Sequence, residues 1–228
     1  MALTGVLCGI RREGRPLLEA AARAGQPVDI RYSGAIAANA RAAAHALVAA
    51  GATRLLSFGV AGALSDSLKP GDLVIPRLIR TTDDEELHTD AAWHAAVLDL
   101  AGATTTDAML GVDHAATSLG QKAFLGAAYD AVALDMESHF LARAAREAGV
   151  PFLAVRAVAD GRRTLLPRAA LVGVGPDGHE RPHRVALSLM QRPNEYLAIW
   201  RLARASAAAF RTLGRVGGLP ALLAGGGV

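Results

Sequence analysis

The sequence predicts an α/β fold, a single domain with a mixed, largely parallel sheet flanked by helices. Short apolar runs alternate with alanine-rich segments of helical spacing along most of the 228 residues, and this alternation is typical of sheets whose strands are joined by helices. The apolar runs are nearly continuous, which indicates that both faces of the sheet are covered. Hydrophobic residues make up 52% of the chain and aromatic residues only 4%, so Ala, Leu and Val must fill most of the core.

The first 60 residues contain three strands and two helices. We predict the strands at 5–9, 28–32 and 55–60 and the helices at 16–24 and 39–50. Pro16 suits the first turn of a helix, and Gly25 and Gly51 suit the positions just behind helix ends.

The same alternation continues to residue 160. We predict strands at 73–78, 131–134 and 152–158 and helices at 89–100 and 137–148. The strand at 73–78 follows a turn of Lys69, Pro70, Gly71 and Asp72, and Gly149 and Pro151 end the second helix. Residues 103–118 are ambiguous, and we expect strand and loop there.

The last third of the chain differs in composition. Residues 161–182 are rich in Arg, Gly and Pro and are predicted as a long loop, with helices at 183–190 and 193–213. On the longer helix one face carries apolar residues spaced by three or four positions, namely Leu197, Trp200, Ala203, Ala207, Phe210 and Leu213. We therefore predict one domain at 1–215, in which 183–215 form a C-terminal helical extension, and a flexible tail at 216–228.

The charged residues are unevenly distributed. The net charge is +3, yet residues 1–160 carry 14 basic and 18 acidic side chains, whereas residues 161–228 carry 10 arginines and 3 acids. A basic segment suits a phosphate, a nucleic acid or an anionic membrane, although a solvated helix face has the same pattern. We expect no nucleic-acid partner, because no recognition motif is present and the acidic front portion would repel phosphates.

Cysteine content and hydropathy predict a cytoplasmic protein. Cys8 is the single cysteine, which excludes an internal disulfide and suits a reducing compartment. No segment approaches the ~18 uninterrupted apolar residues of a membrane span. The N-terminal apolar run precedes the first arginines, so it is interpreted as a strand rather than a signal peptide.

Several common catalytic motifs are missing or occur in the wrong context. The histidines form no HExxH motif or Cys/His cluster, and we expect His88 and His94 at the surface, so no metal site is predicted. The absence of GxSxG argues against a serine hydrolase of that type. Residues 173–178 spell a dinucleotide fingerprint, but Pro176 lies inside it and no strand–helix unit surrounds it, which favours a turn.

Carboxylates follow two of the predicted strands. Asp135 and Glu137 come after the strand at 131–134, and Asp160 comes after the strand at 152–158. Ligands of α/β sheets bind beyond the carboxyl ends of the strands. These three residues are therefore candidates for a functional site.

A third strand is followed by small residues that let a ligand approach the backbone closely, namely Gly59, Val60, Ala61 and Gly62. With Pro70-Gly71-Asp72, Asp135-Met136-Glu137 and the strand that runs from Arg156 to Asp160, this order resembles the purine nucleoside phosphorylase and nucleosidase superfamily. The resemblance covers about residues 3 to 160. It implies that the domain at 1–215 is nucleoside phosphorylase-like and that the protein is an enzyme that cleaves N-glycosidic bonds.

Later segments resemble a narrower branch of that superfamily, the hopanoid-associated phosphorylases. The similar segments lie at 157–160, 166–167, 170–172, 175–178 and 188–193. That branch is thought to remove adenine from adenosylhopane during bacteriohopanepolyol synthesis. The resemblance therefore implies cleavage of adenosylhopane, by a transferase using phosphate or a hydrolase using water.

The resemblance also assigns roles to the candidate residues. Asp160 would protonate N7 of adenine, which requires a raised pKa; general acid catalysis of this kind contributes ~10² to 10⁴-fold. Glu137 would accept hydrogen bonds from the 2′ and 3′ hydroxyls of ribose, and Met136 would pack against the sugar. Asp135 occupies a position where glutamate is common in the superfamily, and its role in substrate binding is less defined. Glu13 is the candidate in the N-terminal turn for activating water.

The co-substrate stays open between inorganic phosphate and water, and no other cofactor is expected. Phosphorylases of the superfamily hold phosphate with an arginine of the N-terminal turn, a place that Arg11 or Arg12 would fill. Two further phosphate-binding positions of the superfamily, an arginine and a serine, align with Ser57 and Val60. Because neither family residue is present, the alignment favours hydrolysis.

The resemblance implies a homo-oligomer and, for a hopanoid substrate, peripheral contact with the inner membrane. The basic helix at 193–213, with Trp200 and Phe210, suits a membrane interface, although these aromatic residues would equally pack on the sheet or on a second subunit. Two other functions stay open: a soluble methylthioadenosine-type nucleosidase and a non-catalytic nucleoside-binding protein.

Overall fold

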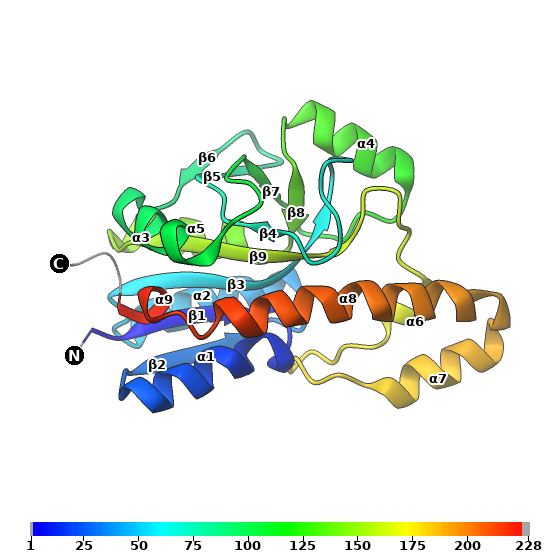
Figure 1. Ribbon diagram of the computed structural model, residues 1–228, viewed down its shortest axis with the longest axis horizontal. Helices are drawn as coiled ribbons and strands as arrows, with labels where there is room; N and C mark the ends of the chain where they lie inside the picture. Colours follow the sequence, from blue (N-terminus) through cyan, green and yellow to red (C-terminus); the bar gives the residue numbers. More distant parts are fainter. Residues whose placement is uncertain (1, 225–228) are drawn as a thin grey trace.

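Strands and helices alternate along the chain in the computed structural model, which describes residues 2–224 (Figure 1). The strands are β1 (Thr4–Cys8), β2 (Val28–Tyr32), β3 (Arg54–Ala63), β4 (Leu73–Val74), β5 (Leu78–Thr81), β6 (Glu86–His88), β7 (Met109–Gly111), β8 (Ala133–Asp135) and β9 (Phe152–Asp160). The helices are α1 (Arg11–Ala24), α2 (Ala37–Ala49), α3 (Ala91–Ala101), α4 (Leu119–Ala128), α5 (Ser138–Ala148), α6 (Arg168–Leu171), α7 (Pro182–Gln191), α8 (Tyr196–Val216) and α9 (Pro220–Ala224), with a 3-10 turn η1 (Pro193–Glu195).

The strands form one mixed sheet, which confirms the predicted fold class. Its order is β2-β1-β3-β8-β7-β5-β6, and β9 pairs with both β3 and β4. The β3/β8, β4/β9 and β5/β6 pairs are antiparallel, and the other pairs are parallel. Strand β3 is central: it pairs with β9 from Leu55 to Gly62 and with β8 at Gly62 and Ala63. The ends of β3, β8 and β9 therefore meet.

Helices cover both faces of the sheet, as the continuous apolar strands indicated. One core cluster joins the sheet to α2 and α5, through residues such as Leu47 and Leu141. The other joins it to α1, α3, α8 and α9, through residues such as Leu17, Trp93 and Leu213. Cys8, at the end of β1, is fully buried in this second cluster.

Helix α1 begins at Arg11, earlier than the predicted start at Pro16. The carboxylate of Glu13 accepts a 2.9 Å hydrogen bond from the backbone N–H of Ile10, and this satisfies one of the donors that are free at a helix start. Pro16 therefore lies inside the helix. Gly25 ends the helix with a left-handed φ of 62°, as predicted.

Two regions in the middle of the chain differ from the prediction. The single strand expected at 73–78 is split into β4 and β5, because Pro76 has no N–H to donate to a ladder. Helix α4 was not anticipated. Its N-cap residue, Ser118, accepts a hydrogen bond from the backbone N–H of Gln121.

The C-terminal region is more ordered than predicted. The expected loop contains α6, and residues 217–224 are not a flexible tail, because α9 buries Leu222 and Leu223 in the core; residues 225–228 lie outside the described residues. The hydroxyl of Thr212 in α8 donates a 2.7 Å hydrogen bond to the carbonyl oxygen of Gly71. Only the second half of α8 is buried, since Leu197 and Trp200 are exposed.

His94 is buried rather than at the surface, and its Nε2 lies 2.9 Å from the carbonyl oxygen of Ile75. Among residues 2–224, no group of three His, Cys, Asp or Glu side chains is arranged to hold a metal ion. No helix in the same residues has the length and apolar character that crossing a membrane requires.

Candidate active site

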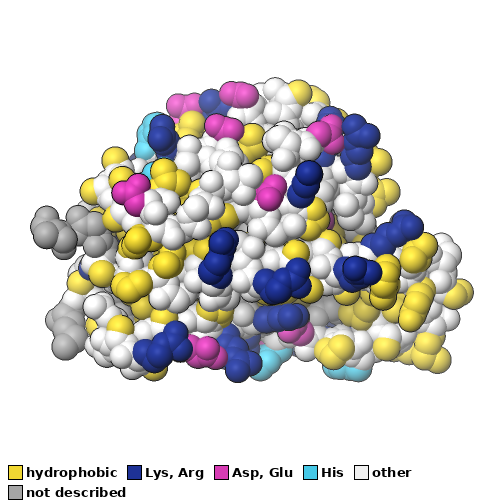
Figure 2. Space-filling model, viewed as in Figure 1, with side chains coloured by type: hydrophobic (Ala, Val, Ile, Leu, Met, Phe, Trp, Pro, Cys, Tyr) yellow, Lys and Arg dark blue, Asp and Glu magenta, His cyan; other side chains and the backbone are white. Residues whose placement is uncertain are grey.

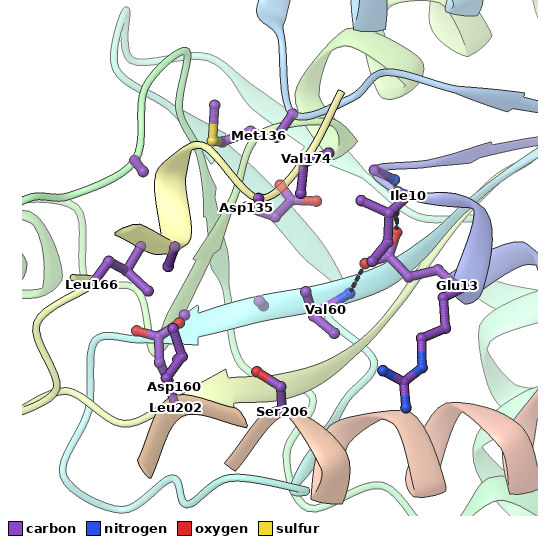
Figure 3. A pocket seen from close by; sticks show the side chains of 18 of the residues that line it. Ile10, Glu13, Val60, Asp135, Met136, Asp160, Leu166, Val174, Leu202 and Ser206 are labelled. Carbon is purple, nitrogen blue, oxygen red and sulfur yellow. Dashed lines mark hydrogen bonds between the residues drawn. The ribbon is translucent and has the colours of Figure 1, made fainter. Parts of the chain in front are cut away.

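A cavity of about 460 Å³ opens where the ends of β3, β8 and β9 meet (Figure 3). Most of the residues that the sequence singled out line this one cavity, namely Arg12, Glu13, Val60, Ala61, Gly62, Asp135, Met136, Glu137 and Asp160. Arg11 and Gly59 are not among its lining residues. The candidate residues from the ends of β3, β8 and β9 thus line one cavity, and the roles assigned to them stay predictions.

Glu13 reaches this cavity from the first turn of α1. Its Oε2 accepts hydrogen bonds from the backbone N–H groups of Gly9 at 2.7 Å and Ile10 at 2.9 Å. Its Oε1 accepts a third, at 2.9 Å, from the N–H of Val60, and Figure 3 shows the bonds to Ile10 and Val60. Burial raises the pKa of Glu13, against the opposing effects of Arg156 and these N–H donors.

Arg156, in β9, is fully buried. Its Nη2 forms a close ion pair with Asp135, lies 3.5 Å from Glu137 Oε2 and donates a 2.5 Å hydrogen bond to the hydroxyl of Ser57. Asp135 also accepts a hydrogen bond from the backbone N–H of Ser138. The Asp135 carboxylate is thus engaged by Arg156 and Ser138, and its role in substrate binding stays a prediction.

Glu137 lies between β8 and α5, beside Glu13. Its Oε1 accepts a 2.8 Å hydrogen bond from the hydroxyl of Ser33. A Cβ at Gly9 would lie 3.3 Å from both Glu13 Oε2 and Glu137 Oε1, so the glycine leaves room for two neighbouring carboxylates. Burial raises the pKa of Glu137 to about 7; Arg156 opposes this shift, and the nearby Asp135 and Glu13 add to it.

Asp160 ends β9 and is buried on the opposite side of the cavity from Glu13 (Figure 3). It faces Gly62, where a Cβ would lie 3.3 Å from either carboxylate oxygen. Lys122 of α4 forms a close ion pair with Asp160 Oδ2 and donates a 3.0 Å hydrogen bond to the carbonyl oxygen of Gly161. Burial raises the pKa of Asp160, although the charge of Lys122 opposes the shift.

The small residues at 59–62 lie inside β3 rather than in a turn behind it, because the strand continues to Ala63. The groups that approach Gly59 belong to the protein: a Cβ there would lie 2.6 Å from Arg156 Nη1 and 2.8 Å from Glu13 Oε1. Gly59 is therefore needed to let the arginine and the glutamate come together.

The two arginines of the N-terminal turn are exposed and stack on aromatic rings. The Arg11 guanidinium lies 5.0 Å from the centre of the Tyr32 ring. Arg12, at the cavity, lies 4.1 Å from the centre of the Phe210 ring and 3.8 Å from Glu180. A phosphate-binding role for Arg11 or Arg12 stays a prediction.

The part of the chain that follows β9 supplies an apolar wall of the cavity. Apolar side chains from the 161–182 segment and from α7 and α8 line it, including Leu166, Val174, Val185, Ile199, Leu202 and Phe210. Val174 belongs to the glycine-rich segment at 173–178, which is a turn as predicted: the N–H of Gly178 donates a 2.9 Å hydrogen bond to the carbonyl oxygen of Gly175.

Comparison with known proteins agrees with this geometry. The family model described as "Phosphorylase superfamily" matches residues 20–190. The chain belongs to the phosphorylase superfamily. Membership in this superfamily makes it an enzyme of the nucleoside phosphorylase and nucleosidase class, as the sequence predicted. No curated protein matches the chain at a significant level.

Solved structures of superfamily enzymes share the fold. A 5′-methylthioadenosine/S-adenosylhomocysteine nucleosidase from Helicobacter pylori has a TM-score of 0.67 at 18% identity, over 95% of this chain and 97% of that one. A putative enzyme of the same name from Francisella philomiragia has a TM-score of 0.66 at 19% identity, over 95% and 97%. Futalosine hydrolase from Helicobacter pylori has a TM-score of 0.62 at 20% identity, over 70% and 88%.

Proposed function

We propose that this enzyme hydrolyses the N-glycosidic bond of an adenine nucleoside that carries a large apolar group on its ribose, and that adenosylhopane, in hopanoid biosynthesis, is its substrate. The observation that carries the proposal is the placement of Glu13, Glu137 and Asp160. These three buried carboxylates line one cavity whose remaining wall is largely apolar.

Glu137 and Asp160 have the chemistry for the two halves of a nucleoside. A carboxylate at Glu137 would accept hydrogen bonds from the ribose 2′ and 3′ hydroxyls, and its charge would stabilise the sugar cation that forms as the bond breaks. Met136 would pack against the sugar. Asp160, at the other side of the cavity, would give its proton to N7 of adenine while the electron pair of the C1′–N9 bond moves into the base.

Water is the nucleophile that this cavity favours over phosphate. A dianionic phosphate beside Glu137 would meet the Glu13 carboxylate at short range and be repelled. The basic side chains on the lining, Arg12 and Lys122, each lie near a carboxylate of the protein. Glu13, held by its three N–H donors, would accept a proton from water as the water oxygen bonds to C1′.

The apolar wall is the reason for choosing a substrate with a bulky apolar substituent. Its side chains belong to the part of the chain that follows β9. A methylthioadenosine-type nucleosidase is the second candidate function, and the shared fold with the Helicobacter pylori nucleosidase favours it. The two candidates differ in the group at the 5′ position of the ribose.

A lipid nucleoside requires access to a membrane, and the proposal extends to peripheral contact through α7 and the start of α8. Figure 2 shows hydrophobic side chains gathered at the end of the molecule where these helices lie, with basic side chains along α8 beside them. Met190 is 81% exposed and Tyr196 67%. The arginines, among them Arg201 and Arg204, would repel each other if two copies met through this face, and they would attract anionic lipid.

The membrane contact is tested by sedimentation with vesicles of phosphatidylglycerol and phosphatidylcholine. The wild-type protein should sediment with the anionic vesicles, and replacement of both Met190 and Trp200 by serine should abolish this. Phe124→Ser is the matched control, because Phe124 is 66% exposed on α4, away from this face. Equal binding by all three proteins would contradict the contact, and so would a stable dimer that the double variant dissociates.

The reaction is tested by incubating the protein with adenosylhopane or 5′-methylthioadenosine, each with and without phosphate. The mass of the sugar product is then determined by mass spectrometry. We expect free adenine and a ribosyl hopane that gains its oxygen from ¹⁸O-labelled water. A sugar phosphate formed only with phosphate would overturn the assignment of water. Asp160→Asn should stop turnover and spare nucleoside binding; binding without turnover by the wild type would favour the non-catalytic alternative.

A further inference from the structure

Lys122 is a buried cation that the mechanism above leaves without a role. Its side chain is 3% exposed. Its ammonium group contacts Asp160 Oδ2 and the carbonyl oxygen of Gly161, and the residue lines the cavity. Lysine is rare in this chain, which has lysines only at 69 and 122 among its 24 basic residues.

A buried lysine is costly, because its charge loses the solvation of water. An ion pair in the interior repays this cost only in part, and apolar residues of the same volume are often as stable. Stability alone therefore gives a weak reason for an ammonium group at this position. Lysine also differs from arginine in presenting a compact point charge, which here contacts a single carboxylate oxygen, Asp160 Oδ2.

The arrangement leaves the other oxygen of Asp160 available to a ligand. Within residues 2–224, Asp160 Oδ1 accepts no hydrogen bond, and both Asp160 and Lys122 line the cavity. Lys122 is the charged group that acts on Asp160. The neighbouring Arg162 and Arg163 point elsewhere, since both pair with Asp66 at the surface.

We propose that Lys122 is a positioning residue for base departure: it orients Asp160 Oδ1 toward the base and stabilises the carboxylate that remains after Asp160 has given up its proton. This inference rests on the proposed function. In the step, the Asp160 proton moves to the base as the C1′–N9 bond breaks, the electron pair goes to the base, and the new carboxylate lies against the Lys122 ammonium. Asp160 regains a proton from solvent after the base has left.

The proposal predicts a dependence on the leaving group. A purine departs with a proton, whereas 4-nitrophenolate departs without one. In Lys122→Met, cleavage of a 5′-alkylthioadenosine should therefore slow about 10- to 100-fold in kcat, which does not exceed the ~10² to 10⁴-fold that general acid catalysis as a whole contributes. Cleavage of the 4-nitrophenyl riboside with the same 5′ group should stay within about threefold. Lys69→Met, the same change at the exposed lysine, should leave both rates unchanged.

A pH profile separates this role from a structural one. The proton on Asp160 is needed for cleavage, so activity falls as the pH rises through the Asp160 pKa. Lys122 lowers that pKa. In Lys122→Met the decline of kcat at high pH should therefore begin at a higher pH, and the maximum value of kcat should be lower. The Asp160 carboxyl can also be followed directly by carbon-13 NMR without substrate, and its signal is identified as the one that Asp160→Asn removes. This signal should titrate at higher pH in Lys122→Met than in the wild type.

The outcomes are distinct for the inference and for the proposed function. Equal losses on both substrates, or an unmoved decline of kcat at high pH and an unmoved Asp160 carboxyl titration, would overturn the role of Lys122. A wild-type protein that cleaves neither riboside would contradict the proposed function. In that case a shifted carboxyl titration would still support control of Asp160 by Lys122, and an unshifted one would refute it.

Discussion

Glu13 Oε1 accepts a 2.9 Å hydrogen bond from the backbone N–H of Val60, a residue 47 positions further along the chain. The other oxygen of the same carboxylate binds the loop after β1. One side chain thus joins the start of α1 to the middle of β3 and also faces the cavity. A change at Glu13 should therefore affect stability and catalysis together.

Glu13→Gln should reduce both the stability and the activity of the enzyme. The amide NH₂ cannot accept the hydrogen bonds that Gly9, Ile10 or Val60 donates to the replaced oxygen, so buried donors lose their partner. We expect a loss of about 1–3 kcal/mol in the free energy of unfolding, measured by urea denaturation. Hydrolysis should fall by about 10²-fold or more if Glu13 activates water.

Glu19→Gln is the matched control for this change, because Glu19 lies on the same helix and pairs with Arg15 at the surface. It should alter the unfolding free energy by less than about 1 kcal/mol. Equal effects of the two substitutions would show that the hydrogen bonds of Glu13 are not needed for folding.

Gly59→Ala should damage the site through crowding. The added methyl group would lie 2.6 Å from Arg156 Nη1 and 2.8 Å from Glu13 Oε1, so both buried side chains must move. We expect a loss of about 1–3 kcal/mol in unfolding free energy, together with reduced turnover. Gly120→Ala, in α4, has open space around its added methyl group, and it should stabilise the protein by about 0.4–1 kcal/mol. Thermal denaturation of the pair provides the comparison.

The location of the site could be predicted from sequence, because strand ends and carboxylates are local features. Asp135, Glu137 and Asp160 follow apolar runs that are recognisable without a structure. Glu13 was also a candidate from sequence, although it lies in the first turn of α1, where the N–H groups of Gly9 and Ile10 hold its carboxylate.

The role of Lys122 could not be predicted in the same way, whereas the pairing of Arg156 with a strand-end carboxylate was expected and is present. The contact between Lys122 and Asp160 joins residues 38 positions apart, and its geometry depends on where the fold places α4 relative to the end of β9. Ser118 and Gln121 form a recognisable N-cap pattern for α4, which was the available signal for that helix. Helix α9 was missed for a similar reason: it is short, and docking against the rest of the molecule stabilises it.

The pH dependence of kcat/KM should report the ionisation of Glu137. Its carboxylate must be charged to accept hydrogen bonds from two ribose hydroxyls, and its pKa is raised to about 7. Activity should therefore fall about tenfold per unit as the pH decreases below this value. Ser33→Ala removes a hydrogen bond that lowers the pKa of Glu137, so the low-pH limb should move to higher pH. A limb that stays in place would contradict the assignment to Glu137.

The same group should make stability depend on pH. The folded pKa of Glu137, about 7, lies above its ordinary value of 4.5, so the folded state binds a proton more tightly than the unfolded state. The stabilising effect of protonation is complete below about pH 4.5 and is lost as the pH rises through about 7. Relative to wild type, Glu137→Gln should therefore gain melting temperature between pH 5 and pH 8. A difference between the two proteins that does not change with pH would contradict this.

Burial of Cys8 has a practical consequence. Cys8 is the only cysteine of the chain, it is fully buried, and burial together with the nearby Glu13 raises its thiol pKa well above the ordinary value. Both effects suppress its reaction with maleimides. A cysteine introduced at the exposed Met190 would thus be the reactive thiol, and a fluorophore or spin label could be attached to the end of α7 without first replacing the native one.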